Sequence, residues 1–179
     1  MSESASRLYR LKLGMYRAAR EADDDFRASG EREYFGISSW MQFADYIGIL
    51  AENRRGRGLP PGWSPYEMNV LLSSGGEILC LGQLRYGDDY DNTTWAGHIG
   101  YTVPPSLRGN GHAKEFLRLS LERAWELGYE RVMLTCDLDN HISRHVIESS
   151  GGIYAGKYLS AEYHKHQYWF YNPKVSEKI

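Results

Sequence analysis

One stretch of the sequence restricts the possible folds more than any other. Residues 93–103, TTWAGHIGYTV, are rich in β-branched and aromatic residues, which are typical of a strand. Pro104 and Pro105 end that strand, because proline cannot donate a hydrogen bond to a sheet. A turn with two glycines follows, and residues 111–127 then carry apolar side chains at helical spacing. The sequence therefore predicts a strand that leads through a short turn into an amphipathic helix.

Further apolar patterns predict elements on both sides of this unit. Residues 67–73 and 77–86 are separated by a tight glycine turn and give the clearest hairpin signal. Residues 131–138 form a nearly continuous apolar run, the pattern of a central strand. Other predicted elements are an edge strand or an irregular segment at 7–13, helices at 16–28, 38–52 and 140–152, a loop at 53–63, and strands at 152–159 and 167–172. This order predicts an α+β fold with a mixed sheet in one domain, residues 1–179, and a crossover helix after the strand 93–103.

Charge and composition exclude several classes of partner. The net charge of −2 and the pI near 6.3 give no basic face for a nucleic acid. No window approaches the roughly 18 apolar residues of a membrane span, and the first residues lack the apolar stretch of a signal peptide. Cys80 and Cys136 lie in apolar segments, which favours buried thiols over a disulfide. We therefore expect a cytoplasmic monomer or homodimer that binds neither nucleic acid nor a membrane.

The turn between the predicted strand and helix has the residue types of an anion site. A glycine-containing turn at a helix start leaves N–H groups unpaired beside the positive end of the helix dipole, and glycine allows a diphosphate to approach the main chain. Gly109 and Gly111 provide these conditions, although two glycines can also form nothing more than a tight turn. The residues that follow, His112 to Glu115, contain neither the Lys-Ser/Thr of a Walker loop nor the third glycine of a dinucleotide fingerprint.

The same segment resembles a known signature. Arg108-x-x-Gly111-x-Ala113 is similar to the Arg/Gln-x-x-Gly-x-Gly/Ala motif of the GNAT superfamily of N-acetyltransferases, and it follows a Val-Pro strand end as in that family. The resemblance extends over about residues 67–172, through LERAWELG, VMLTCD, DN..S..VIE..GG and a final YWF, and it is strongest to a bacterial branch of predicted acetyltransferases. It implies a central, mostly antiparallel sheet with one splayed strand pair, flanked by helices.

The resemblance also implies acetyl-CoA as co-substrate, without a metal. Backbone groups of residues 109–114 would hold the pyrophosphate, and the main chain of residues 101–103 would pair with the pantetheine arm where the sheet splays. Asn140 would hydrogen bond that arm or serve as a helix N-cap, and the two residues Ser143 and Arg144 would reach the phosphates. The implied cofactor-binding residues are Tyr101, Thr102, Val103, Arg108, Gly109, Asn110, Gly111, His112, Ala113, Lys114, Asn140, Ser143 and Arg144.

In such enzymes an amine of a small molecule or peptide attacks the thioester directly. His98, on the strand that leads to the predicted loop, is our candidate base, since imidazole relays protons near neutral pH. Many relatives carry a tyrosine seven residues after the Asn, but Ile147 stands there in this chain. This departure leaves the acid open among Tyr154, Tyr158, Tyr163, a water molecule or no acid. It also motivates an alternative, an acyl-CoA-binding module without transferase activity.

Overall fold

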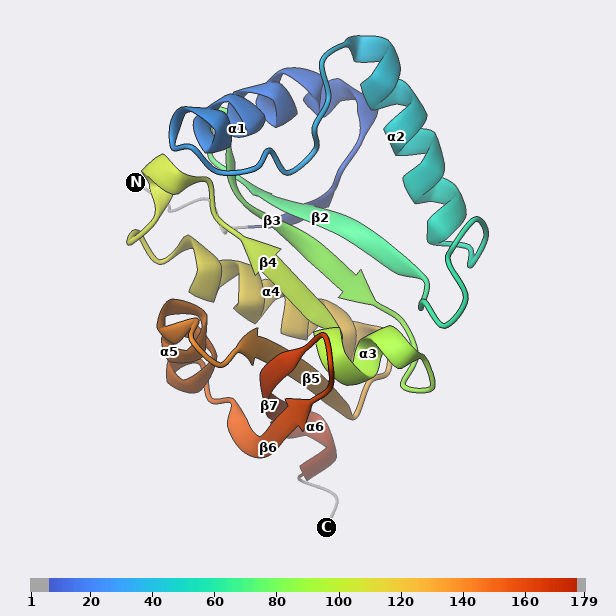
Figure 1. The fold of residues 1–179 in the computed structure, drawn as a ribbon, viewed down its shortest axis with the longest axis vertical. Helices are drawn as coiled ribbons and strands as arrows, with labels where there is room; N and C mark the ends of the chain where they lie inside the picture. Colours follow the sequence, from blue (N-terminus) through green and yellow to red (C-terminus); the bar gives the residue numbers. More distant parts are fainter. Residues whose placement is uncertain (1–6, 177–179) are drawn as a thin grey trace.

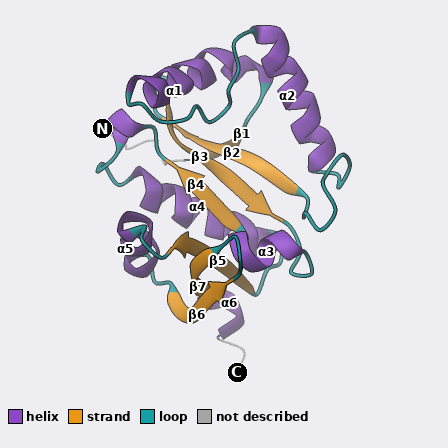
Figure 2. Cartoon of the chain, viewed as in Figure 1, coloured by secondary structure: helices purple, strands orange, loops and turns teal. Residues whose placement is uncertain are grey.

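A single open sheet of seven strands forms the centre of the molecule (Figure 1). The structure is a computed structural model and describes residues 7–176. The strands follow the order β1-β2-β3-β4-β5-β7-β6 across the sheet. Their bounds are β1 Leu8–Arg10, β2 Tyr66–Leu72, β3 Ile78–Arg85, β4 Ile99–Thr102, β5 Arg131–Asp137, β6 Ile153–Leu159 and β7 His164–Tyr171. The helices, shown in Figure 2, are α1 Tyr16–Ala28, α2 Trp40–Asn53, α3 Asp91–Ala96, α4 His112–Glu126, α5 His141–Ser149 and α6 Pro173–Ser176, with 3-10 turns η1 Leu13–Met15 and η2 Pro105–Leu107.

The sheet opens between its two central strands. All neighbouring strands are antiparallel except β4 and β5, which are parallel because α4 connects them as a crossover helix. Only Ile99 and Leu134 are paired between β4 and β5, whereas β5 pairs with β7 along its whole length. Beyond Ile99 and Leu134 the two parallel strands diverge toward their C-terminal ends (Figure 1). We call the space between these diverging ends the splay.

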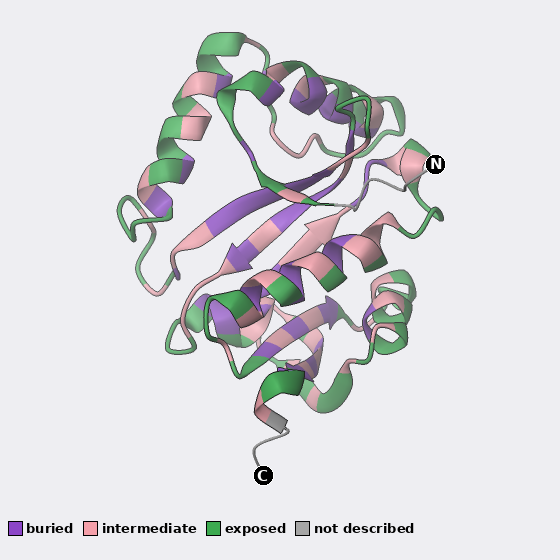
Figure 3. Ribbon diagram, turned by 180° about the vertical axis from the view of Figure 1, so that it is seen from behind, coloured by how far each residue is buried: buried purple, intermediate pink, exposed green. Residues whose placement is uncertain are grey.

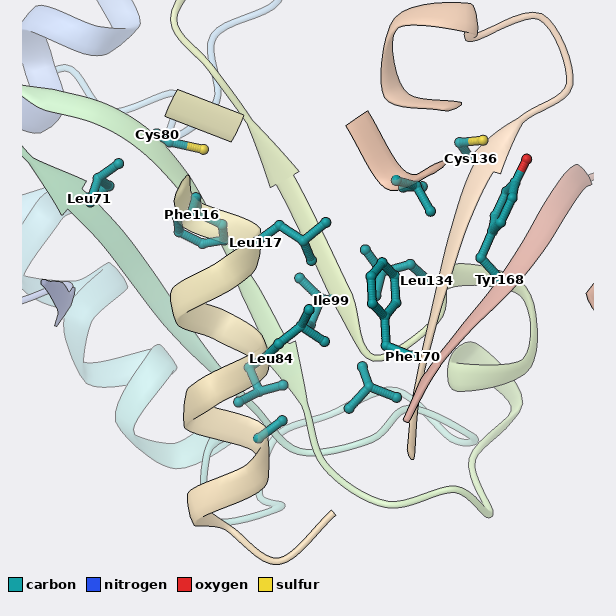
Figure 4. Packing of buried hydrophobic residues seen from close by; sticks show 14 of the residues in the cluster. Leu71, Cys80, Leu84, Ile99, Phe116, Leu117, Leu134, Cys136, Tyr168 and Phe170 are labelled. Carbon is teal, nitrogen blue, oxygen red and sulfur yellow. The ribbon is translucent and has the colours of Figure 1, made fainter. Parts of the chain in front are cut away.

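Helices cover both faces of the sheet. On one face, which we call the front face, α1 and α2 pack on β3 and β2 around a core that includes Phe43 and Val70. On the other face α4 lies along β3 and β4, with its buried side toward the strands (Figure 3). Phe116 and Leu117 of α4 pack near Ile99 in this second core (Figure 4). The second core includes Ile99 and packs against Tyr101, so α4 supports β4 from the back face at the edge of the splay.

The fold class predicted from the sequence is confirmed: a mixed, mostly antiparallel sheet flanked by helices. The predicted hairpin is β2 and β3, and the predicted crossover helix is α4, which follows Gly111 and ends next to Gly128. Of the segment 7–13, residues 8–10 form the edge strand β1, and the 3-10 turn η1 begins at Leu13. Cys80 and Cys136 are both free and buried.

The prediction of one strand over residues 93–103 is wrong. Its first part belongs to the helix α3, and only residues 99–102 form β4. The chain turns at Gly97, which has φ +69° and no room for a side chain, since a Cβ atom would lie 2.7 Å from a carbonyl of β5. Thr135 and Gln167 donate hydrogen bonds to two carbonyl groups of α3, at 3.0 and 2.8 Å. These long-range contacts outweigh the local strand preference of the β-branched residues.

Candidate functional site

The loop before α4 exposes a row of unpaired backbone donors. Gly109 and Gly111 both have φ +82°, a conformation that glycine adopts at little cost. Gly111 is the N-cap of α4, and no side chain caps that helix end. Within residues 7–176, no protein acceptor is hydrogen bonded to the N–H groups of residues 109–114. Six consecutive free donors at the positive end of a helix dipole can bind a diphosphate.

Acidic residues of a distant segment hold this loop in place. The Arg108 guanidinium donates to both carboxylate oxygens of Glu31, at 2.7 and 2.8 Å, and its Nε donates to the Val103 carbonyl at 3.1 Å. The same contact holds the pKa of Glu31 below its usual value. Asp25 of α1 accepts from both the N–H and the hydroxyl of Ser106, at 3.0 Å each. The side chain of Arg108 therefore shapes the loop, which leaves the backbone donors to face outward.

The other side chains of the loop differ in what they contact. Asn110 donates through Nδ2 to the carbonyls of Leu107 and Arg108, at 3.0 and 3.3 Å, and so closes the turn. Ala113 packs against the core behind α4. His112 and Lys114 lie in the first turn of α4 and have no protein partner among the described residues. Their side chains are therefore available to a phosphate beside the loop.

The edge of β4 that faces the splay has free main-chain groups at one position. The N–H of Arg85 donates to the carbonyl of His98, and antiparallel ladders alternate, so the main chains of Gly100 and Thr102 face β3. The N–H and C=O of Tyr101 then face β5, where no residue of β5 is paired with them. Tyr101 can thus pair with an extended ligand in the splay, whereas Thr102 is already paired with β3.

Side chains of β4 and α5 meet at the splay. The Tyr101 hydroxyl lies 3.3 Å from the hydroxyl of Ser143, and burial raises the pKa of Tyr101 to about 12. Asn140 is the N-cap of α5, since its Oδ1 accepts from the Ser143 N–H at 2.9 Å. Arg144 instead donates to Glu148, on its own helix, at 2.9 Å. Asn140, Ser143 and Tyr101 are therefore brought together, and Arg144 lies outside the group.

His98 is buried at the start of β4 and has both ring nitrogens engaged. Its Nδ1 accepts from the Met133 N–H at 2.9 Å, and its Nε2 donates to the carboxylate of Asp88 at 2.7 Å. The first contact implies the Nε2-protonated tautomer. Burial lowers the pKa of His98, although Asp88 opposes that effect. The ring of His98 thus links β4 to β5 in place of a main-chain hydrogen bond. His98 could act as a base only if its contact with Met133 or with Asp88 were broken.

Tyr154 and Tyr158 lie on opposite faces of β6. Tyr154 is opposite Tyr168 of β7, Tyr158 is opposite Lys165, and one extra residue bulges between them. Tyr168 belongs to the core under α5, while Lys165 lies three residues away and so faces the front. β6 is also the outer edge strand, beyond β7 and β5. The two tyrosines therefore cannot act at one point, and both stay separated from β4 by two strands.

Ile147 and Tyr163, the two other positions considered for the acid, lie in different parts of the fold. Ile147, where relatives carry a tyrosine, is fully buried in the core under α5. Tyr163, in the turn between β6 and β7, stacks on Trp95 of α3 with the ring centres 4.0 Å apart. Ile147 thus supports the core, and Tyr163 packs on α3.

Sequence reasoning missed Arg85 of β3. The side chain is partly buried on the front face, and its terminal nitrogens lie beside Gly100, where a Cβ atom would be 3.4 Å away. The alternation of Leu81, Gln83 and Arg85 was the available signal, because two polar residues follow a buried leucine on the same face.

Two open pockets lie at opposite ends of α4. One, of about 500 Å³, is lined by Arg27 and residues 31–36, and it includes Glu31, the partner of Arg108. The other, of about 680 Å³, surrounds Gly128 at the C-terminal end of the helix. The 15 residues of α4 separate the two ends by about 22 Å. Of these two pockets, the first shares Glu31 with the ion pair that holds the loop with the free donors.

In the part of the chain from residue 7 to 176, no three His, Cys, Asp or Glu side chains gather as metal ligands would. No helix in that same range is long and apolar enough to cross a membrane.

Comparison with known proteins points to one family. A family model described as an acetyltransferase (GNAT) domain matches residues 15–153. No curated protein sequence matches the chain significantly. Among solved structures, a Salmonella typhimurium acetyltransferase that modifies the N-terminal serine of ribosomal protein L7/L12 has a TM-score of 0.64 at 16% identity, covering 95% of this chain and 96% of its own. A Mycobacterium smegmatis RimJ in complex with CoA-disulfide has a TM-score of 0.67 at 18% identity, covering 95% and 87%.

A third similar structure is that of an enzyme named for a polyamine acceptor. The spermidine/spermine N-acetyltransferase of Vibrio cholerae has a TM-score of 0.61 at 13% identity, covering 97% of this chain and 98% of its own. At such low identities these likenesses show the fold alone.

Proposed function

Because the chain belongs to the GNAT acetyltransferase family, we propose that residues 109–114 and Tyr101 hold acetyl-CoA and that the acceptor is an α-amine. The enzyme class follows from the family: the protein is an N-acetyltransferase that transfers the acetyl group of acetyl-CoA to an amine. The acceptor's identity and the residues at the site are the parts that we propose. The free cysteines support a cytoplasmic location.

The observation that carries the cofactor site is the row of free donors at residues 109–114. A diphosphate would accept several of these N–H groups at once, and charge-assisted hydrogen bonds are about twice as strong as neutral ones. Tyr101 would add main-chain hydrogen bonds, so that the pantetheine arm lies in the splay as an extra strand does. The exposed Asn140 has a free side-chain amide that can bond the same arm. Acetyl-CoA supplies an activated acetyl thioester.

The hydroxyl groups of Tyr101 and Ser143 are our candidates for contact with the departing sulfur. They lie 3.3 Å apart at the splay, and a phenol with a pKa of about 12 stays protonated at neutral pH. A protonated hydroxyl can donate a hydrogen bond to a thiolate, which stabilises it as a leaving group. Tyr101→Phe and Ser143→Ala should each lower kcat while the Kd for CoA stays close to that of the wild type.

The choice of an α-amine rests on the lack of a free strong base. Deprotonating a lysine-like amine of pKa about 10.4 at pH 7 costs roughly 4–5 kcal/mol, whereas an α-amine near 7.8 costs only about 1 kcal/mol. His98 has both ring nitrogens occupied, so it cannot accept a proton without losing a contact. An α-amine needs little help, because a large fraction is already neutral at pH 7.5. The N-terminus of a peptide and a free amino acid both provide such a group.

A pair of matched peptides tests this proposal. One peptide has a free N-terminus and no lysine, and the other has a blocked N-terminus and one lysine. Thiol release from acetyl-CoA and mass spectrometry of the products identify the amine that is modified, with spermidine and free amino acids in the same panel. We expect acetylation of α-amines only. Modification of lysine or spermidine alone would contradict the α-amine proposal, and tight CoA binding without any turnover would favour the acyl-CoA-binding module.

A further inference from the structure

Arg85 is a partly buried cation on the front face, beside the part of β4 that leads into the splay. Its terminal nitrogens donate to the carbonyls of Ala96 and Gly97, at 3.4 and 3.2 Å, and to the side chain of Gln83 at 3.1 Å. All three acceptors are neutral. The two terminal nitrogens would also lie 3.4 and 3.5 Å from a Cβ atom at Gly100. Glycine at that position therefore leaves room for the guanidinium directly over β4.

The guanidinium of Arg85 lacks a counter-ion. No carboxylate of the described chain pairs with it, and the ionisable groups near it are Tyr34, Tyr66 and His98. The other arginines described either pair with a carboxylate, stack on a ring as Arg131 does on Trp169, or lie exposed. Burial of an unpaired charge is costly, which makes Arg85 unusual in this molecule. An anion brought by a ligand would remove that cost.

The position of Arg85 relates it to the acceptor rather than to acetyl-CoA. The loop with the free donors lies beyond the C-terminal end of β4, where acidic residues of α1 and of the segment after it hold the loop. Arg85 instead lies at the C-terminal end of β3, beside the start of β4 and on the front face. Gly100, which it overlies, directly precedes Tyr101, our main-chain anchor for the pantetheine arm. Tyr34, its neighbour, lines the open pocket next to Glu31. A ligand that enters from this side would meet Arg85 near the thioester.

We propose that Arg85 binds a carboxylate of the acceptor, so that the acceptor is an amine with a carboxylate a few bonds from its nitrogen, as in an α-amino acid. This inference rests on the proposed function, because it assumes a thioester beside Tyr101. Arginine suits the role, since its planar fork can form two parallel hydrogen bonds with a carboxylate. A polyamine carries positive charge along its length and would be repelled by the same guanidinium.

Pairs of acceptors that differ only in the carboxylate test the proposal. We would measure acetylation of free L-amino acids and of their carboxamides, which keep the α-amine and the side chain but lose the negative charge, with spermidine and a neutral tripeptide alongside. We expect kcat/KM for amino acids to exceed that for their amides by at least about tenfold, the effect of one charge-assisted contact. Equal rates, or a preference for amides or spermidine, would overturn the inference.

Variants of Arg85 separate the contact from a structural role. Arg85→Gln should raise KM for amino acids by about tenfold or more and leave the rate with amides unchanged, whereas Arg85→Lys should recover part of the loss. The Kd for CoA serves as the control for folding, since Arg85 hydrogen bonds only residues outside the loop. An equal loss for acids and amides in both variants would assign Arg85 to structure alone. If amides or peptides are acetylated but amino acids are not, the inference fails while the proposed function stands; if no amine is acetylated, the proposed function fails.

Discussion

The two ends of α4 offer a matched test of the diphosphate site. Gly111 precedes the helix with φ +82°, and Gly128 follows it with φ +92°. A Cβ atom added at either glycine would meet nothing within 4 Å. The cost of alanine at each position is therefore backbone strain alone, about 1–2 kcal/mol for a left-handed residue. In a chain of 179 residues, each kcal/mol lowers Tm by about 2–4 °C.

Gly111→Ala and Gly128→Ala should thus lose similar stability, with Tm lower by about 2–8 °C in differential scanning calorimetry. Only Gly111→Ala places a methyl group beside the free donors of residues 109–114. Losing one charge-assisted hydrogen bond to the diphosphate costs about 1.5–3 kcal/mol, which is roughly 10–100-fold in Kd.

Isothermal titration calorimetry with CoA measures that difference directly. We expect Gly111→Ala to bind CoA at least about tenfold more weakly, while Gly128→Ala keeps the affinity of the wild type. Desulfo-CoA and ADP, titrated in parallel, should show the same loss, because both carry the diphosphate. Equal affinities for the two folded variants would refute the assignment of the diphosphate to this loop, and so would an equal loss at Gly128.

Three other changes have defined outcomes. Glu67 is a buried carboxylate that contacts three partly exposed arginines, one in β1, one directly after α2 and one in α4. Glu67→Gln should therefore lower the unfolding free energy by about 2 kcal/mol in urea titrations, and an unchanged midpoint would contradict this. Burial lowers the pKa of His98 in the folded protein, so the unfolded chain takes up the proton first as the pH falls. The free energy of unfolding should therefore decrease below about pH 6.5 and level off above it, and His98→Gln should flatten that profile. Glu31→Gln should weaken CoA binding, because it frees Arg108 from the contact that shapes the loop, and it should change Tm little, because this ion pair is solvent-exposed. CoA affinity equal to wild type would argue that the loop keeps its shape without Glu31.

The elements whose signals are local were predictable from the sequence. The β2–β3 hairpin depends on a glycine turn between two alternating strands, and α4 depends on helical spacing after two glycines. The loop at residues 108–111 was identified for the same reason, since its geometry follows from glycine and from the helix that it begins. Whether that loop binds acetyl-CoA stays a prediction, as do the roles of His98, Tyr154 and Tyr158.

Tertiary structure decided which side chains meet. The helix α3 forms because the chain turns at Gly97 and because side chains of β5 and β7 donate hydrogen bonds to carbonyl groups of α3. These hydrogen bonds join residues more than 30 positions apart. His98 links β4 to β5, since its Nδ1 accepts a hydrogen bond from the main-chain N–H of Met133. One bulged residue placed Tyr154 and Tyr158 on opposite faces, which no period-2 pattern foretells.

The sequence by itself thus determined most of the elements and the loop before α4, because the signals for strands, helix starts and glycine turns lie within a few neighbouring residues. The order of those elements along the chain then predicted the mixed sheet and the crossover. Only the tertiary structure decided that Asp25 and Glu31 hold that loop and that Arg85 lies unpaired beside Gly100. Hydrogen bonds and charges across 77 or 81 residues of chain depend on how the elements pack, and packing is a property of the whole fold.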